Sequence, residues 1–97
     1  MFQIAFTVEA MDDLDALKKH DARRITDAIE IQLSSQPAVS TKSRKRLRPN
    51  PLADWELKVG TFRVFYNVDE RESLVRVLAI GQKTGNQLFI HGERFDL

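Results

Sequence analysis

The sequence contains no cysteine, only four glycines and three prolines, and no long apolar run. Without cysteine, neither disulfides nor thiolate metal sites can stabilise a chain of 97 residues. No stretch approaches the roughly 18 consecutive apolar residues of a membrane-spanning helix. The segment 1–6 lacks the basic region and the cleavage site of a secretion signal. We therefore expect a cytoplasmic protein with no membrane partner.

The composition is that of a soluble globular protein, with 42% hydrophobic and 30% charged residues. At this length one compact core is expected, so residues 1–97 are predicted to form a single domain. The sequence also lacks a GxGxxG motif, a P-loop, an HExxH motif and any Cys/His cluster. It therefore predicts neither a nucleotide cofactor nor a bound metal.

Hydrophobic periodicity predicts a strand followed by two helices in the first part of the chain. Residues 3–7 alternate polar and apolar side chains, as a short strand does. Thr7 can cap a first helix, which the basic stretch 18–20 would close with a charge favourable to the helix dipole. Asp21 can cap a second helix that ends before Pro37. Each helix has one apolar face, so the pair is expected to form an antiparallel hairpin on a sheet.

The second half predicts that sheet. Apolar and polar residues alternate over 55–59 and 62–68, the segment 74–80 is almost continuously apolar, and 87–91 can form a last short strand. The fold class is therefore α+β. Its expected order is β-α-α-β-β-β, in which an N-terminal strand and the two-helix hairpin precede a mainly antiparallel sheet of three to four strands.

The loop Gly60-Thr61 fixes the register of one hairpin, because a two-residue loop starting with glycine suits a type II′ turn. Lys58 then faces Arg63, and Glu56 faces Phe65, all on the face opposite the helices. Two cations across a ladder repel one another unless an anion joins them. Glu56, Lys58 and Arg63 therefore form either an anion-binding site or an ordinary sheet surface in which Glu56 neutralises the two cations. Phe65 lies on the same open face and could stack on a nucleobase.

Charge is unevenly distributed along the chain. Residues 1–41 carry four basic and seven acidic groups, whereas residues 42–97 carry eleven basic and seven acidic groups. The densest run has five cations in seven residues: Lys42, Arg44, Lys45, Arg46 and Arg48. Such a run can keep a loop solvated or supply several phosphate contacts, and RNA binding is its functional interpretation.

The segments 46–48, 55–60, 62–68 and 77–83 together resemble the RelE/ParE toxin superfamily of type II toxin–antitoxin systems. They supply a basic-Leu-basic stretch, a strand led by an aromatic residue, a G-x-aromatic-R-V-x-Y segment, and a hydrophobic strand that ends in I-G before a basic position. The resemblance implies the fold described above. It also implies a cognate antitoxin that holds the toxin in a hetero-oligomer.

The resemblance further implies an mRNA endonuclease, or mRNA interferase, that inhibits translation on or off the ribosome. In RelE-like members the ribose 2′-hydroxyl attacks the adjacent phosphorus without a metal and leaves a 2′,3′-cyclic phosphate. Basic side chains stabilise the charge of the transition state. Lys58, Arg63 and Lys83 match basic positions of that pattern.

Two positions depart from the RelE pattern. Glu56 stands where ribosome-dependent nucleases often have a second lysine, and Phe89 lies near the place where some carry a tyrosine. Glu56 or His91 would then carry out the proton transfer. Histidine is a candidate because imidazole side chains have an intrinsic pKa near neutral pH. Two alternatives stay open: a ParE-like inhibitor that binds DNA gyrase, and a catalytically degenerate regulator bound to its antitoxin.

Overall fold

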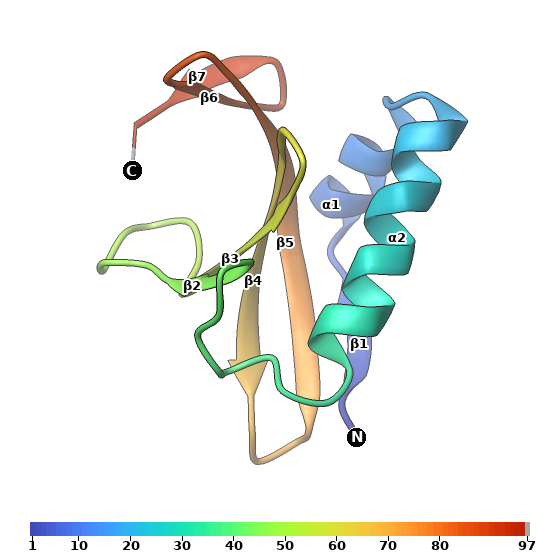
Figure 1. The fold of residues 1–97 in the computed structure, drawn as a ribbon, viewed down its shortest axis with the longest axis vertical. Coiled ribbons are helices and arrows are strands. Elements are labelled where there is room, and N and C mark those ends of the chain that lie inside the picture. The colour runs from blue at the N-terminus through green and yellow to red at the C-terminus, as the bar shows by residue number, and fades with distance from the viewer. Residues whose placement is uncertain (97) are drawn as a thin grey trace.

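The computed structural model describes residues 1–96, and its sheet carries two helices on one face (Figure 1). The first elements are β1 (Gln3–Phe6), α1 (Val8–Asp15) and α2 (Lys19–Leu33). The strands that follow are β2 (Arg44–Arg46), β3 (Trp55–Val59), β4 (Phe62–Asp69), β5 (Leu74–Thr84), β6 (Gln87–Ile90) and β7 (Glu93–Phe95). The predicted α+β class and element order are confirmed.

The sheet has the strand order β2-β3-β4-β5-β6-β7, and every neighbouring pair in this order is antiparallel. β1 lies parallel to β5, beside its first half. The sheet is wider than the predicted three to four strands, because the basic run forms β2 and the C-terminal segment forms both β6 and β7.

The two helices begin and end for identifiable reasons. Thr7 caps α1 as predicted, since its side-chain oxygen accepts a hydrogen bond from the Ala10 N–H at 3.1 Å. The prediction for the end of α1 was wrong: α1 ends at Asp15, and the basic stretch 18–20 begins α2 instead. A 3.1 Å bond from the Leu17 N–H to the Leu14 carbonyl tightens the last turn and lets the chain reverse.

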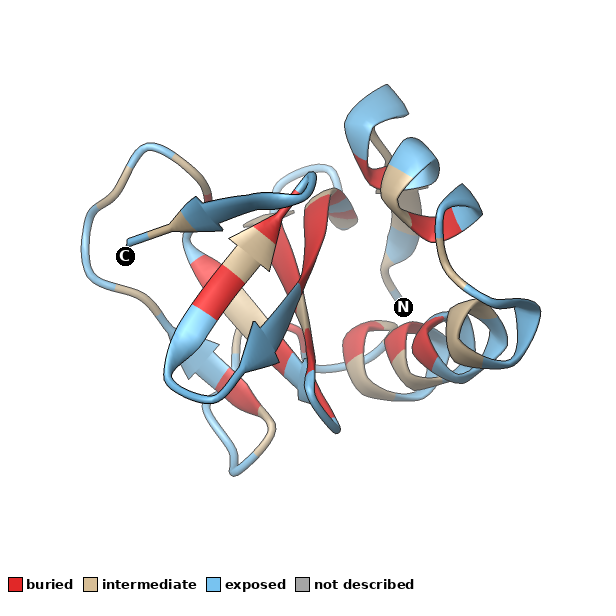
Figure 2. Cartoon of the chain, turned by 90° about the horizontal axis from the view of Figure 1, so that it is seen from above, coloured by how far each residue is buried: buried red, intermediate tan, exposed pale blue. Residues whose placement is uncertain are grey.

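The main core lies between the helices and the sheet. The helices contribute Ala10, Leu14, Ile25, Ile29 and Leu33, and the β3–β4 hairpin contributes Trp55, Leu57, Val59, Phe62, Val64 and Tyr66. These hairpin residues lie on the face opposite Glu56, Lys58 and Arg63, as the register of the two-residue loop predicts. The prediction of the helix-covered face is therefore confirmed. In Figure 2 the buried positions lie in the interior between the helices and the C-terminal strands.

A second, smaller core covers the opposite face of the sheet. It consists of Ala53, Phe65, Ala79, Leu88 and Ile90, with Leu47, Leu52, Leu78 and Phe95 packed around them. The register between β4 and β5 shifts at Phe65 and Tyr66, which leaves one extra residue on β5. Such a bulge bends a strand, and the second half of β5 carries β6 and β7 over this face (Figure 1).

Candidate functional site

A groove of about 780 Å³ lies between the basic segment 45–50 and the C-terminal strands. We call it the cationic groove, because five cations and two acids line it: Lys45, Arg46, Arg48, Lys83, Arg94, Glu56 and Asp96. Polar and apolar side chains complete the wall, among them Asn50, Asn86, Leu88 and Phe95. This excess of positive charge in a concave surface favours an anionic, extended ligand.

The first wall of the cationic groove is built on β2. Lys45 lies directly across from Glu56 in the β2–β3 ladder, and Arg46 lies across from Trp55. The Arg46 guanidinium carbon is 5.7 Å from the centroid of the Trp55 ring, a cation–π distance. These cations are therefore carried by a paired strand rather than by the solvated loop that charge alone would predict.

The loop after β2 is fixed by Asn50, which the sequence analysis missed. Its side-chain amide donates to the carbonyls of Arg48 at 2.7 Å and Ala53 at 2.9 Å, and its oxygen accepts from the N–H groups of Leu52 at 2.8 Å and Ala53 at 3.1 Å. Asparagine favours such turns because its side chain bonds to nearby backbone groups. The stretch Asn50-Pro51 was the signal that could have shown an ordered loop.

The second wall of the cationic groove comes from β5 and the C-terminal hairpin. Lys83 lies across from Leu88, which in turn lies across from Phe95 on β7. Leu88 and Phe95 pack in the second core, so the strand that carries Arg94 is anchored by apolar contacts. Arg94 was not predicted, because nothing in the sequence placed it opposite the basic segment 45–50.

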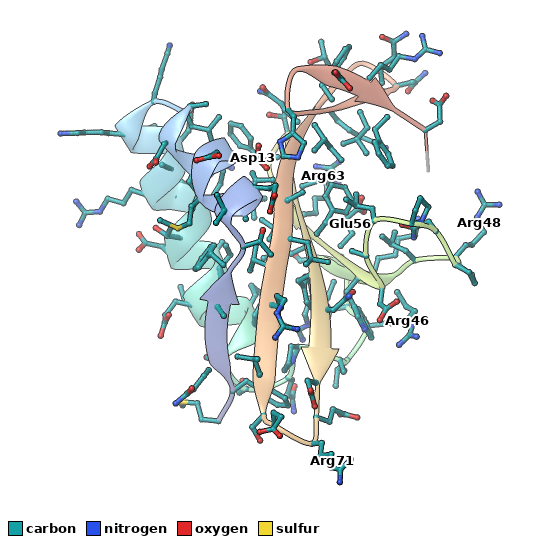
Figure 3. The ribbon with its side chains drawn as sticks, turned by 180° about the vertical axis from the view of Figure 1, so that it is seen from behind. Asp13, Arg46, Arg48, Glu56, Arg63 and Arg71 are labelled. Carbon is teal, nitrogen blue, oxygen red and sulfur yellow. The ribbon has the colours of Figure 1, made fainter. Side chains whose placement is uncertain are left out.

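Glu56 and Lys83 are the two predicted catalytic residues that the structure brings to the cationic groove. Glu56 is half-buried, between Lys45 on β2 and Phe65 on β4. In Figure 3 Glu56 lies near the centre of the molecule, whereas Arg46 and Arg48 point outward on the side of the basic segment 45–50. One carboxylate among several cations can accept a proton while its neighbours stabilise negative charge.

The predicted pair Lys58 and Arg63 does face across the hairpin, so its register is confirmed. The Arg63 Nη1 group, however, donates to the carbonyls of Gly60 and Phe62, both at 2.9 Å. Its guanidinium is thus folded back on its own turn. Lys58 is exposed, and both residues lie outside the lining of the cationic groove.

The structure buries the side chains of two residues that were predicted to contact RNA. Phe65 is 0% exposed in the second core and has no face to offer a nucleobase. Arg44 is 8% exposed: its Nε donates to the Val39 carbonyl at 2.9 Å, and its Nη1 donates to the backbone and side-chain oxygens of Gln32, each at 2.8 Å. Arg44 therefore joins β2 to the end of α2. Lys42 is exposed and precedes β2, outside the groove lining.

His91, the other predicted base, lies at the turn between β6 and β7 and outside the groove lining. Its Nδ1 is 2.7 Å from Oδ1 of Asp13, and Oδ2 of Asp13 accepts a hydrogen bond from the Ile80 N–H at 2.9 Å. The structure therefore separates His91 from Glu56 and joins it to α1. Asp13 was not predicted as part of a site, because its partners lie far along the chain.

The titration of the buried Tyr66 hydroxyl departs clearly from the ordinary range. Burial raises the pKa of Tyr66, and the nearby positive charge of Arg44 offsets a part of that increase. The hydroxyl donates to the Pro37 carbonyl at 2.7 Å. Tyr66 thus stays neutral and holds the segment after α2, so it belongs to the core rather than to the site.

Within residues 1–96, no group of three or more His, Cys, Asp or Glu side chains is arranged to hold a metal ion. Among the helices of this part of the chain, none has the length and apolar character needed to cross a membrane.

The fold of the chain is similar to that of chains from two solved toxin–antitoxin complexes. It superposes on the RelBE2 toxin–antitoxin complex of Mycobacterium tuberculosis with a TM-score of 0.70 at 23% identity, over 84% of this chain and 98% of that one. For the archaeal RelE–RelB complex of Pyrococcus horikoshii OT3, the TM-score is 0.61 at 18% identity, over 87% of this chain and 96% of that one. At these identities the likeness concerns the fold.

The sequence model of the ParE toxin of the type II toxin–antitoxin system parDE matches residues 4–86. The chain therefore belongs to this toxin family, within the RelE/ParE superfamily. None of the curated proteins matches the sequence.

Proposed function

We propose that the chain is a toxin that cleaves mRNA in the cationic groove. The observation that carries this proposal is the position of Glu56 in a concave surface that also holds Lys45 and Lys83. A single RNA strand supplies both the negative charge that such a groove attracts and the 2′-hydroxyl that a carboxylate can deprotonate. We place this activity in the cytoplasm, where mRNA is available, on or off the ribosome.

The reaction needs only the RNA, water and the chain's own side chains. Glu56 accepts the proton of the 2′-hydroxyl while the 2′-oxygen forms a bond to the adjacent phosphorus. The bond from phosphorus to the 5′-oxygen breaks, and that oxygen takes up a proton from water as it leaves, so the products are a 2′,3′-cyclic phosphate and a 5′-hydroxyl. Glu56 then returns its proton to the solvent. Lys83 and Lys45 stabilise the charge that develops on the phosphate oxygens.

The decisive substitution is Glu56→Gln, which keeps the shape of the side chain and removes the base. We expect cleavage to fall at least about 10²-fold, the lower end of the range for general-base catalysis. Primer extension on cellular mRNA after induction measures this. Binding of a short RNA should be retained, because a negative charge has left the groove.

The matched control is Glu72→Gln, an exposed glutamate in the turn between β4 and β5. Full cleavage by Glu56→Gln would contradict the assignment.

A second function has its own support, since the matching family model is that of a ParE toxin. Inhibition of DNA gyrase by binding would need no general base. The separation of His91 from the groove removes one predicted base, and the burial of Phe65 removes one predicted RNA contact. Both observations agree with an inhibitor that does not cleave RNA. An SOS response with intact mRNA would select gyrase, and Glu56→Gln would then stay toxic.

We further propose that an antitoxin binds this chain and forms a hetero-oligomer with it. The two similar solved structures are both toxin–antitoxin complexes. An acidic antitoxin segment would match the five cations of the groove and would compete with RNA for them. Co-expression with the small protein encoded next to this chain tests the proposal, because an antitoxin should copurify and relieve growth arrest.

A further inference from the structure

The carboxylate of Asp13 connects three parts of the fold that are distant in the sequence. It projects from α1, as Figure 3 shows. One oxygen accepts the Ile80 N–H of β5, and the other pairs with His91 at the β6–β7 turn. The Asp13 side chain is only 8% exposed, whereas that of His91 is 48% exposed. An almost buried carboxylate with a partner on each oxygen is held in one position.

Asp13 lies where β5 changes its neighbouring strand. The first half of β5 pairs with β1 up to Val77, and the second half pairs with β6 from Gly81 onward. Ile80 falls in the gap between them, so Asp13 supplies the acceptor that a neighbouring strand would otherwise provide. This gap is also next to the bulge that bends β5 over the second core.

The turn that carries His91 has a backbone that histidine adopts less readily than asparagine. β6 and β7 are joined by two residues, His91 at φ 55° and Gly92 at φ 76°. Two central residues with positive φ define a type I′ turn, for which Asn-Gly and Asp-Gly are the preferred sequences. The imidazole at this position therefore makes a contact that the turn itself does not require.

The hairpin that His91 holds forms one wall of the cationic groove, through Leu88, Arg94 and Phe95. We propose that Asp13 and His91 are positioning residues, which clamp this hairpin by its turn to α1 and so set the width of the groove. The clamp itself is a property of the fold. Its effect on RNA rests on the function proposed above.

Three variants of matched shape test the clamp. His91→Asn provides an amide donor close to the position of Nδ1, and His91→Asp has the same shape and turn preference but offers Asp13 only a like charge. The double variant Asp13→Asn/His91→Asp moves the carboxylate across the pair and restores a donor. It has the same net charge as His91→Asn. Hydrogen exchange of the amides of β6 and β7 is measured first, and affinity for a short single-stranded RNA second.

We expect His91→Asp to raise the exchange rates of these amides at least about tenfold and to weaken RNA binding by a similar factor. His91→Asn and the double variant should stay close to the unmodified chain in both measurements. Retained protection in His91→Asp would overturn the clamp. Loss of cleavage in His91→Asn, with protection and affinity intact, would overturn the positioning role and make the imidazole a base. If the unmodified chain binds no RNA, the proposed function fails, whereas hydrogen exchange still decides on the clamp.

Discussion

At the scale of single residues, the same charge serves two purposes in the basic run. Arg44 lies on the face of β2 that points toward α2, and its guanidinium bonds to three oxygens of the preceding segment. Lys45, one residue later, points to the opposite face and lines the cationic groove. The density of positive charge in the sequence identifies this run. Only the alternation of side chains along a strand distinguishes Arg44, which stabilises the fold, from Lys45, which lines the groove.

We predict that Arg44→Met destabilises the fold by about 1–3 kcal/mol, because it leaves part-buried oxygens of Val39 and Gln32 without their charged donor. The control is Lys45→Met, at an exposed position, which should change the free energy of unfolding by no more than about 0.5 kcal/mol. Urea denaturation followed by circular dichroism measures both. Equal stability of the two variants would show that Arg44 does not hold β2 to α2.

At the scale of elements, the hairpin of β3 and β4 was predictable from the sequence and the C-terminal hairpin was not. The loop Gly60-Thr61 permits one register, so the faces of both strands followed from period two. The turn between β6 and β7 had no comparable signal in the sequence, since histidine is an unusual first residue for a type I′ turn. The burial of Phe65 in the second core depends on a bulge in β5. This bulge results from packing across the sheet rather than from the local sequence.

The candidate site divides in the same way. Glu56 was found because a strand with regular alternation carries it, whereas Lys83 was found because it matches a basic position of the RelE/ParE pattern. Asp13 could not be found, because its partner His91 is 78 positions away. Contacts of that separation are fixed by how the elements pack, so a single sequence holds no local trace of them.

Gly81 on β5 lies close to β6, and this close approach gives a prediction for the pair of strands. A Cβ at Gly81 would lie 2.7 Å from the Phe89 carbonyl oxygen and 2.9 Å from a side-chain carbon of Ile90. We expect Gly81→Ala to destabilise the fold by about 1–3 kcal/mol through overpacking, and to lower the midpoint of thermal unfolding. Gln82→Ala, at the exposed neighbouring position, should have little effect. An unchanged midpoint in Gly81→Ala would mean that β6 can move away from β5 at no cost.

At the scale of the whole molecule, charge is divided between the two faces. The helices belong to residues 1–41, where acidic groups outnumber basic ones, and the cationic groove belongs to the part where basic groups dominate. Such a division orients a polyanion toward the groove before contact and keeps it away from the helices. The affinity for RNA should accordingly depend on where the positive charges lie and not only on their number.

We predict that RNA affinity falls steeply with salt and that only groove cations set the slope. With about four phosphate contacts, log K should fall against log salt with a slope of roughly −3 for a single strand. The double variant Lys45→Gln/Arg94→Gln removes two groove cations and should make the slope shallower by about 1.4. The matched control Lys42→Gln/Lys58→Gln removes two exposed cations outside the groove and should leave the slope nearly unchanged. Fluorescence anisotropy over a salt series measures all three proteins. Equal slopes for the two double variants would show that RNA responds to overall charge, and the cationic groove would lose its role as the binding site.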